Sequence, residues 1–368
     1  MPLVKIDPKN KRLFLKILPY PIIFFLGGLM YVNIEFGLLG DSEIYPSSGT
    51  VYNPFNSALS ITYMTIILGL LLGIIEESVF KNRFRNLPFY LKIFSKTLLY
   101  IFLFVLTLLI FSIGLHVVNT GKPATDPDVY QTVFLYFTRY AFVSIAIFAS
   151  AIISLSLFFT EIVDYLGLDI VGNFFSGRYS KPVYENRIFM FLDMKGSTTI
   201  AEKIGHKKHY ELINEYYSNM SDAIVRTSGS IYQYVGDEIV VSWKLAEGLK
   251  NWNCLQCYFQ IEEDIEKKSQ HYLSKYGVVP GFKAGLHSGE VTRGQIGRIK
   301  RDLLYTGDVL NATARIQGLC NQLRVHVLIS GHLKKLLPNN DLIYKPMGEF
   351  ELRGRQKKEE LFSVEAKA

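Results

Sequence analysis

Cysteine and charged residues are both scarce in this sequence. Its 368 residues include three cysteines, an odd and small number that argues against a disulfide framework and indicates a reducing compartment. Cys254 and Cys257 have the spacing of a metal-binding pair, but no second pair follows, so a packed helix face is the simpler interpretation. Only 20% of the residues are charged, whereas 49% are hydrophobic. This balance indicates a chain that is partly embedded in a membrane.

Long apolar segments dominate the first part of the chain. Each approaches the roughly 20 residues that a helix needs to cross a bilayer core. None has the polar face expected of helices in a soluble bundle, which is the alternative interpretation. Arg139 lies in the last of them, near its outer end, where the side chain is expected to reach the membrane interface. We therefore predict a four-helix transmembrane domain over residues 1–160, with helices at roughly Ile17–Leu39, Ala58–Ile75, Leu98–Val118 and Thr132–Phe159.

The basic residues predict how these helices cross the membrane. The formal net charge is +7. Lysines and arginines cluster before the first segment and around the loop between the second and third, whereas the loops 40–56 and 119–131 carry only Lys122. The positive-inside rule then places both termini in the cytoplasm of a multi-pass protein of the inner or plasma membrane. The same distribution accounts for much of the basic excess, so nucleic acid is not predicted as a partner.

A change of composition separates the two halves of the chain. Residues 161–186 contain Gly167, Gly172, Gly177 and Pro182, which are typical of a linker. Residues 187–368 are enough for one further α/β domain.

The order of the predicted elements in this second half favours a ferredoxin-like α+β layer. Strands are expected where apolar runs are short. Helices are expected where apolar residues recur every three or four positions over a longer stretch. The expected strands are Arg187–Asp193, Gly229–Val235, Glu238–Lys244, Phe282–Leu286, Glu290–Ile296, Val325–Ile329, Leu342–Pro346 and Leu361–Val364. The expected helices run from the Met194–Thr199 turn to about Thr227, over Asn251–Tyr276 and over Asp308–Cys320.

Two aspartates occupy positions suited to metal ligands. Asp193 ends a buried strand, and the small-residue turn after it offers backbone N–H groups that favour phosphate. Asp237 follows Gly236 in a hairpin turn signal. Such a hairpin can bring Asp237 beside the end of the neighbouring strand. Two converging carboxylates would then bind two divalent ions in a triphosphate site.

Four segments together resemble the class III nucleotidyl cyclase domain. They are Phe191–Thr198, Gly236-Asp237, Gly285–Gly289 and Gly307–Arg315, in the family's order across the whole second half. The resemblance implies the ferredoxin-like (palm-like) nucleotidyl cyclase fold for residues 187–368. It also implies conversion of a nucleoside triphosphate to the 3′,5′-cyclic monophosphate and pyrophosphate, for intracellular signalling. A diguanylate cyclase shares this core, but its Gly-Gly-Asp/Glu-Glu-Phe signature is missing because Val235 precedes Gly236.

The resemblance also implies roles for individual residues. Asp193 and Asp237, with the Met194 carbonyl, would bind two Mg²⁺ or Mn²⁺ ions. Asn311 would orient the ribose, and Arg315 would stabilise charge on the α-phosphate; their spacing of four puts both on one helix face. The triphosphate would be held by Lys195, Gly196, Ser197, Thr198, Lys283, Arg353 and Arg355. Many members have arginine where Lys283 stands, so charge is kept but bidentate geometry is lost.

In this family two chains share each catalytic site. The metal ligands come from one chain and the Asn/Arg pair from the other, so the resemblance implies a homodimer with two equivalent sites. The segment Gly297–Thr306, with Arg298, Lys300 and Arg301, would be the arm that crosses the interface.

The residues expected to select the base depart from the family's two patterns. Adenylate cyclases typically have Lys at the position of Gln233 and Asp, Thr or Ser at that of Leu304, whereas guanylate cyclases have Glu and Cys. Gln233 can donate and accept hydrogen bonds, and Leu304 can do neither. ATP is favoured because most bacterial members use it. A guanylate cyclase and a catalytically inactive nucleotide-binding signalling module are the alternatives.

Overall fold

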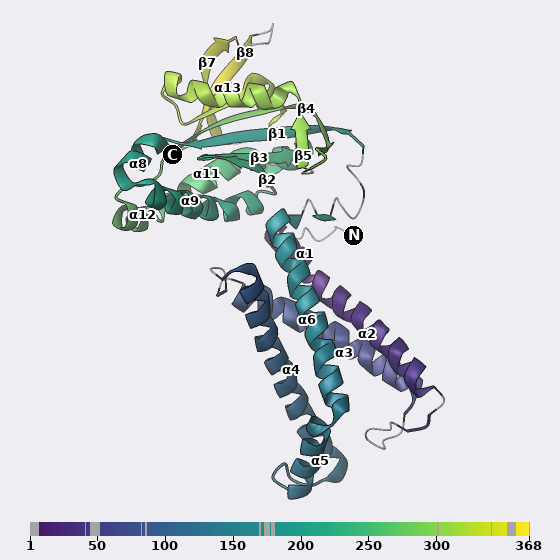
Figure 1. Cartoon of the computed structure of the whole chain (residues 1–368). Coiled ribbons are helices and arrows are strands. Elements are labelled where there is room, and N and C mark those ends of the chain that lie inside the picture. The colour runs from purple at the N-terminus through teal and green to yellow at the C-terminus, as the bar shows by residue number, and fades with distance from the viewer. Residues whose placement is uncertain are drawn as a thin grey trace. The chain divides into compact units, whose positions relative to one another are not determined.

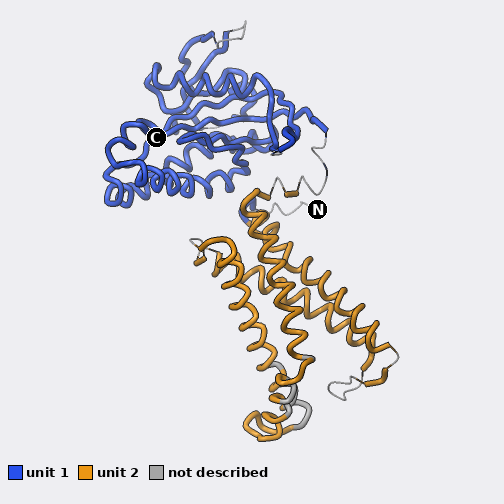
Figure 2. Tube along the Cα trace, in the orientation of Figure 1, with its two compact units in different colours: residues 1–9, 173–368 blue, residues 10–172 orange. Residues whose placement is uncertain are grey.

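The chain consists of two compact units. The computed structural model describes residues 7–40, 42–44, 52–81, 83–84, 87–168, 171–172, 177, 181–299, 302–339, 341–351 and 358–367. One unit comprises residues 10–172, and the other comprises residues 1–9 and 173–368 (Figure 2).

The first unit is built from helices (Figure 1). Among the residues that the structure describes, four helical stretches are long and apolar enough to cross a membrane: Pro8–Leu39, Pro54–Phe80, Phe89–Gly114 and Phe142–Leu166. This confirms the predicted helical, apolar character of the first part of the chain. The helices are α1 (Pro8–Ile17), α2 (Pro19–Leu39), α3 (Pro54–Ile75), η1 (Glu76–Phe80), α4 (Phe89–Thr120), α5 (Pro127–Thr138) and α6 (Tyr140–Leu166).

The prediction of one helix over Thr132–Phe159 is wrong. Arg139 has an extended backbone, with φ −82° and ψ 149°, and it separates α5 from α6. A guanidinium is costly inside an apolar span. Because the helix restarts after Arg139 and continues to Leu166, this residue lies outside the stretch able to cross a membrane.

Close packing between α2 and α3 depends on small residues. A Cβ atom added at Gly69 would lie 2.7 Å from the Cα atom of Pro21, which is too close for a real contact. Glycine therefore lets the two backbones approach, as in other helix pairs that pack in apolar surroundings.

Ionisable side chains join the helices at one end of this unit. Glu76 and Lys96 are 5% and 2% exposed and form an ion pair, and the Tyr100 hydroxyl donates to the other Glu76 oxygen over 2.7 Å. Lys92 pairs with Glu161 of α6. The remaining contacts are Lys81 with Glu77 and Asp164, Lys16 with Asp164, and Tyr20 with Thr160. All four candidate spans thus contribute to one polar cluster.

Replacing Lys96 with methionine is expected to destabilise the helical unit by about 3–5 kcal/mol, because Glu76 would stay buried without its cation. The measurement is loss of helical circular dichroism on heating of the full-length protein in detergent. Lys122→Met is the matched control, since Lys122 pairs with Asp128 at an exposed site and such pairs contribute about 1 kcal/mol or less. Equal melting temperatures for the two variants would contradict the prediction.

The second unit contains an eight-stranded sheet. Seven strands follow the order β2-β3-β1-β4-β6-β8-β7, and β5 pairs with β4. Only β4 and β6 are parallel. The strands are β1 (Val183–Met194), β2 (Ser230–Val235), β3 (Glu238–Lys244), β4 (Phe282–Ile296), β5 (Asp302–Thr306), β6 (Val327–Ser330), β7 (Leu342–Phe350) and β8 (Glu359–Ala366).

Helices cover both faces of this sheet (Figure 1). Helices α9 and α11 pack on one face of the sheet, and Trp243 and Tyr216 are fully buried in the core on this side. The other face packs under α13. The helices of this unit are α8 (Ser197–Ile204), α9 (His206–Arg226), α10 (Leu245–Leu249), η2 (Lys250–Trp252), α11 (Asn253–Glu266), α12 (Ser269–Tyr276), α13 (Asp308–Leu323) and α14 (Gly331–Leu336).

The order β1, helices, β2, β3, helices, β4 confirms the ferredoxin-like prediction, since these four strands lie as β4-β1-β3-β2. The expected hairpin between Phe282–Leu286 and Glu290–Ile296 is wrong. These residues form one continuous strand that pairs with β1 from Phe282 to Arg293, so Ser288 and Gly289 are not a turn. The helix expected over Asn251–Tyr276 is also interrupted. Asn251 and Trp252 have positive φ, and Glu266 and Ser269 bound a second break.

Candidate functional site

Strand β1 lies between β3 and β4, and Asp193 stands at its C-terminal end, at one edge of the sheet. The Asp193 backbone pairs with Glu238 of β3 on one side and with Lys283 of β4 on the other. The side chain of Asp193 is 25% exposed, so water and ions can reach it. Met194 follows as the last residue of the strand and is buried.

The β2–β3 hairpin brings Asp237 to the same edge. Gly236 has φ +63°, a conformation that strains other residues. The Tyr217 hydroxyl of α9 donates to the Gly236 carbonyl over 2.9 Å, and its ring stacks on Tyr234 at 4.6 Å between centroids. The turn that carries Asp237 is therefore held against α9. Because Glu238 pairs with Asp193, its neighbour Asp237 lies beside the end of β1, as the sequence predicted.

Negative charge gathers at this edge. The pKa of Glu238 is raised to about 7, chiefly by burial and then by Asp193 and Asp237, while Lys283 opposes the shift. Three carboxyl groups in one half-buried place favour a cation, and oxygen is the ligand type that Mg²⁺ and Mn²⁺ prefer. Among the described residues, no three acidic, histidine or cysteine side chains are arranged so that they could hold a metal ion by themselves. The donor set therefore fits divalent ions whose remaining ligands are substrate oxygens or water.

Two side chains contact the same oxygen of Asp193. The Lys283 Nζ and the Gln317 Nε2 each lie 3.2 Å from Oδ2. Lys283 comes from β4 and Gln317 from α13, so three elements meet at this carboxylate. Asp193 therefore has one ion-pair partner and one hydrogen-bond donor that the sequence pattern did not predict to lie together.

The turn after β1 is less open than predicted. The Lys195 N–H donates to the Gly281 carbonyl over 2.8 Å, so it is already used. Burial lowers the pKa of the Lys195 side chain. Ser197 Oγ lies 3.0 Å from His209 Nε2 of α9. Gly196 has φ +64° and, like Thr198, is exposed at the start of α8. These positions leave Gly196 and Thr198 as the accessible part of the turn.

Helix α13 presents Asn311 and Arg315 away from the metal-site residues. Asn311 is exposed and Arg315 half-buried. The Arg315 Nη1 is buried without a hydrogen-bond partner. No hydrogen bond or ion pair among the described residues of this chain joins either side chain to Asp193 or Asp237. One chain by itself thus brings together only the first half of the predicted site.

The residues expected to select the base lie on different strands. Gln233 is exposed on β2, at an irregularity in its pairing with β3. Leu304 is half-buried on β5 and pairs with Gly294. Next to it, the guanidinium groups of Arg187 and Arg293 lie 4.9 and 5.0 Å from the centre of the Tyr305 ring. These contacts anchor β5 on the sheet. Lys300, Arg301, Arg353 and Arg355 lie outside the described residues.

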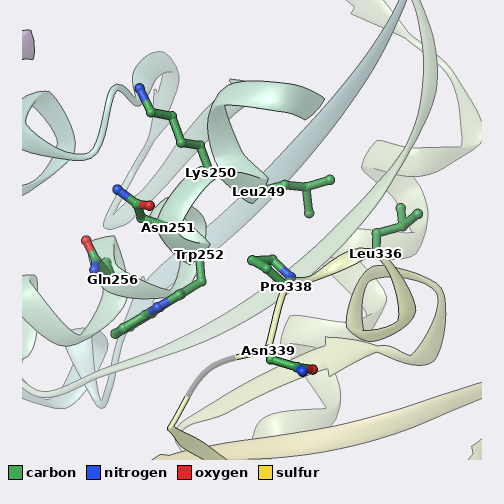
Figure 3. A pocket seen from close by; sticks show the side chains of 8 residues that line it. All are labelled: Leu249, Lys250, Asn251, Trp252, Gln256, Leu336, Pro338 and Asn339. Carbon is green, nitrogen blue, oxygen red and sulfur yellow. The ribbon is translucent and has the colours of Figure 1, made fainter. Parts of the chain in front are cut away.

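A groove of about 800 Å³ lies elsewhere in this unit (Figure 3). Residues of α10, η2 and α11 form one side, and residues at and after the end of α14 form the other. None of the predicted site residues lines it. The groove therefore does not bear on the site at Asp193.

Sequence reasoning missed Glu238 and Gln317. Glu238 directly follows Asp237, so its proximity could have been read from the hairpin alone. Gln317 is two residues after Arg315, which puts it about 200° further round α13. Its contact with Asp193 depends on how that helix crosses the sheet, which no local pattern records.

Comparison with known proteins gives a consistent picture. The family profile of the adenylate and guanylate cyclase catalytic domain matches residues 179–366. Adenylate cyclase 2 of Rhizobium meliloti (strain 1021) is 36% identical over 224 residues, which cover 61% of this chain and 62% of that protein. The adenylate cyclase of Anabaena cylindrica is 28% identical over 147 residues, covering 38% of this chain and 28% of that protein. This chain thus spans less than two thirds of the length of these relatives.

A solved structure shares the fold. That of a bacterial light-regulated adenylyl cyclase matches with a TM-score of 0.53 at 19% identity, over 62% of this chain and 67% of that one. At this identity the likeness concerns the arrangement of helices and strands.

Proposed function

This chain belongs to the adenylate and guanylate cyclase catalytic domain family, and from that premise we propose that it converts a nucleoside triphosphate, with ATP favoured, to the 3′,5′-cyclic monophosphate and pyrophosphate. The observation that carries the proposal is the convergence of Asp193, Asp237 and Lys283 at one edge of the sheet. In the reaction the ribose 3′-oxygen bonds to the α-phosphorus, pyrophosphate leaves, and the hydroxyl proton passes to solvent.

Asp193, Asp237 and the Met194 carbonyl would hold two divalent ions in this proposal. When bound, such ions activate the ribose hydroxyl and neutralise the triphosphate. Lys283 is the cation nearest to the carboxylates and would turn to the phosphates, together with Lys195 and the Gly196–Thr198 turn. Arg353 and Arg355 are proposed to complete these contacts.

The proposal includes a homodimer, because Asn311 and Arg315 do not reach Asp193 within one chain. Asn311 of one protomer would orient the ribose at its partner's metal site, and Arg315 would stabilise the charge that develops on the α-phosphate. Arg315 is half-buried, so part of its side chain is accessible on the surface of the single chain.

We place the catalytic domain at residues 187–368, behind a linker at 161–186 and a membrane domain at 1–160. The basic segments would keep both termini in the cytoplasm of an inner or plasma membrane protein. This arrangement would deliver the cyclic nucleotide to the compartment where its substrate is made.

The test is an assay of the purified full-length protein with Mg²⁺ or Mn²⁺ and either ATP or GTP, with cyclic products identified by mass spectrometry. Formation of cyclic AMP in excess of cyclic GMP supports the proposal. Excess cyclic GMP would favour the guanylate cyclase alternative. No cyclic product under any of these conditions would defeat the catalytic proposal and favour an inactive signalling module.

The Gln233→Lys variant is expected to raise the preference for ATP over GTP by about tenfold. The Gln233 amide can both donate a hydrogen bond to a base and accept one, whereas a lysine at this position could only donate. One such hydrogen bond contributes about 1.5 kcal/mol. The measurement is the ratio of kcat/KM for the two substrates. Gln256→Lys, on α11 and lining the groove of Figure 3, controls for added charge. An unchanged ratio would remove Gln233 from the base-selecting residues.

A further inference from the structure

Helix α13 carries two groups of polar side chains on nearly opposite sides. Asn311 and Arg315 are four residues apart and share one side, whereas Gln317 follows Arg315 by two residues and lies about 200° further round the helix. Their burial agrees with this geometry. Asn311 is exposed, while Gln317 is 6% exposed.

The position of Gln317 is set by close packing on β4. A Cβ atom at Gly285 would lie 2.4 Å from the backbone nitrogen of Gln317, so only glycine lets α13 sit this low on the strand. One turn later, Cys320 Sγ donates to the Ala284 carbonyl over 3.4 Å. The helix is therefore fixed to the strand at both residues, and the Gln317 side chain reaches across to β1.

The Gln317 amide meets the carboxylate on the side where Lys283 also binds. Both nitrogens lie 3.2 Å from Asp193 Oδ2. Lys283 has a long, flexible side chain that the proposed reaction needs at the triphosphate. Gln317 has no proposed contact with the triphosphate, and its backbone is held by the close packing of α13 on Gly285. Gln317 would therefore keep its hydrogen bond to Asp193 when Lys283 turns to the triphosphate.

We propose that Gln317 is a positioning residue for Asp193, so that each α13 acts on both catalytic sites of the dimer. Through Gln317 the helix orients the metal ligand of its own chain, and through Asn311 and Arg315 it serves the partner's site. This inference rests on the proposed function. One helix would therefore contact both sites, so a shift of α13 would change the two sites together.

Gln317→Leu is expected to weaken Mn²⁺ binding about tenfold, the usual effect of losing a side chain that orients a metal ligand. The full-length protein in detergent is titrated with Mn²⁺ in the presence of 3′-deoxy-ATP, which cannot cyclise, and free Mn²⁺ is measured by electron paramagnetic resonance. Thr313→Val is the matched control. Thr313 is fully buried on the same side of α13, and its hydroxyl donates to the Val309 carbonyl over 2.7 Å.

Outcomes of this titration separate the inference from the proposed function. Weaker binding in Gln317→Leu and Asp193→Ala, with Thr313→Val unchanged, supports the inference. Unchanged binding in Gln317→Leu alone overturns it and leaves the metal site intact. Unchanged binding in Asp193→Ala would instead overturn the proposed metal site. Raising Mn²⁺ should also restore the activity of Gln317→Leu, which a misfolded variant would not allow.

Mixing of variants gives a second test, at a Mn²⁺ concentration where Gln317→Leu is poorly active. Mixed with Arg315→Ala, it should regain activity, because the heterodimer has one site with neither defect. Mixed with Asp193→Ala, it should not, because both defects then affect metal ligands. The reverse pattern would show that Gln317 acts with Arg315 on the partner's site and would overturn the inference.

Discussion

Cyclic nucleotide formation is expected to fall by about 1,000-fold when Asp237 is replaced with alanine, because the proposed site would lose one of the two carboxylates that would hold its metal ions. The fold should survive. The turn at Asp237 is held by the Gly236 backbone and by the Tyr217 hydroxyl, neither of which involves the aspartate side chain. The measurement is the rate of cyclic product formation by the full-length protein with saturating Mn²⁺.

Asp222→Ala is the matched control for this loss, since Asp222 is exposed on α9. It should leave the activity within about twofold of wild type, as surface changes generally do. Asp193→Ala should be equally inactive but less stable, because Lys283 would lose its ion-pair partner in a mostly buried place. Activity of Asp237→Ala within about tenfold of wild type, with an unchanged melting curve, would remove Asp237 from the metal site.

Two inactive variants are expected to restore each other's activity when mixed. In the proposed site, Asp193→Ala would lack a metal ligand, and Arg315→Ala would lack the cation that stabilises negative charge on the α-phosphate. If two chains share each site, a heterodimer of these variants has one complete site and one that carries both defects. The purified heterodimer should then have about half of the wild-type activity, since one of its two sites is intact.

This rescue depends on exchange of subunits, so the two variants should be expressed together and purified with different tags on each chain. Expression of Asp193→Ala with Asp237→Ala is the control, because both changes affect the same half of the site and no complete site forms. Equal activities in the two heterodimers would contradict the shared site. The result would then place Arg315 and Asp193 in one chain's site, reached by a movement of α13.

Only some features of the helical unit could be predicted from the sequence. The apolar segments and their basic flanks are visible in the sequence because they depend on composition. The buried pair of Glu76 and Lys96 is not, since these residues are twenty positions apart and belong to different helices. Likewise, no periodicity marked the break at Arg139, where the cost of a charge in an apolar span competes with helix propensity.

In the second unit, too, some features were visible in the sequence and others depended on tertiary contacts. Sequence alone determined that Asp193 ends a strand and that Asp237 occupies a tight turn, because glycine at a positive φ and an apolar strand are local requirements. It also predicted that Asn311 and Arg315 share a helix face, which follows from helix geometry.

The tertiary structure alone decided what surrounds Asp193. The strand pairing of β1 with β3 and β4 brought Glu238 and Lys283 beside it, and the packing of α13 on Gly285 brought Gln317. Register and helix packing depend on contacts between residues up to 124 positions apart, whose free energies no short segment contains. The two aspartates were therefore evident from the sequence, whereas the groups that hold and tune them were not.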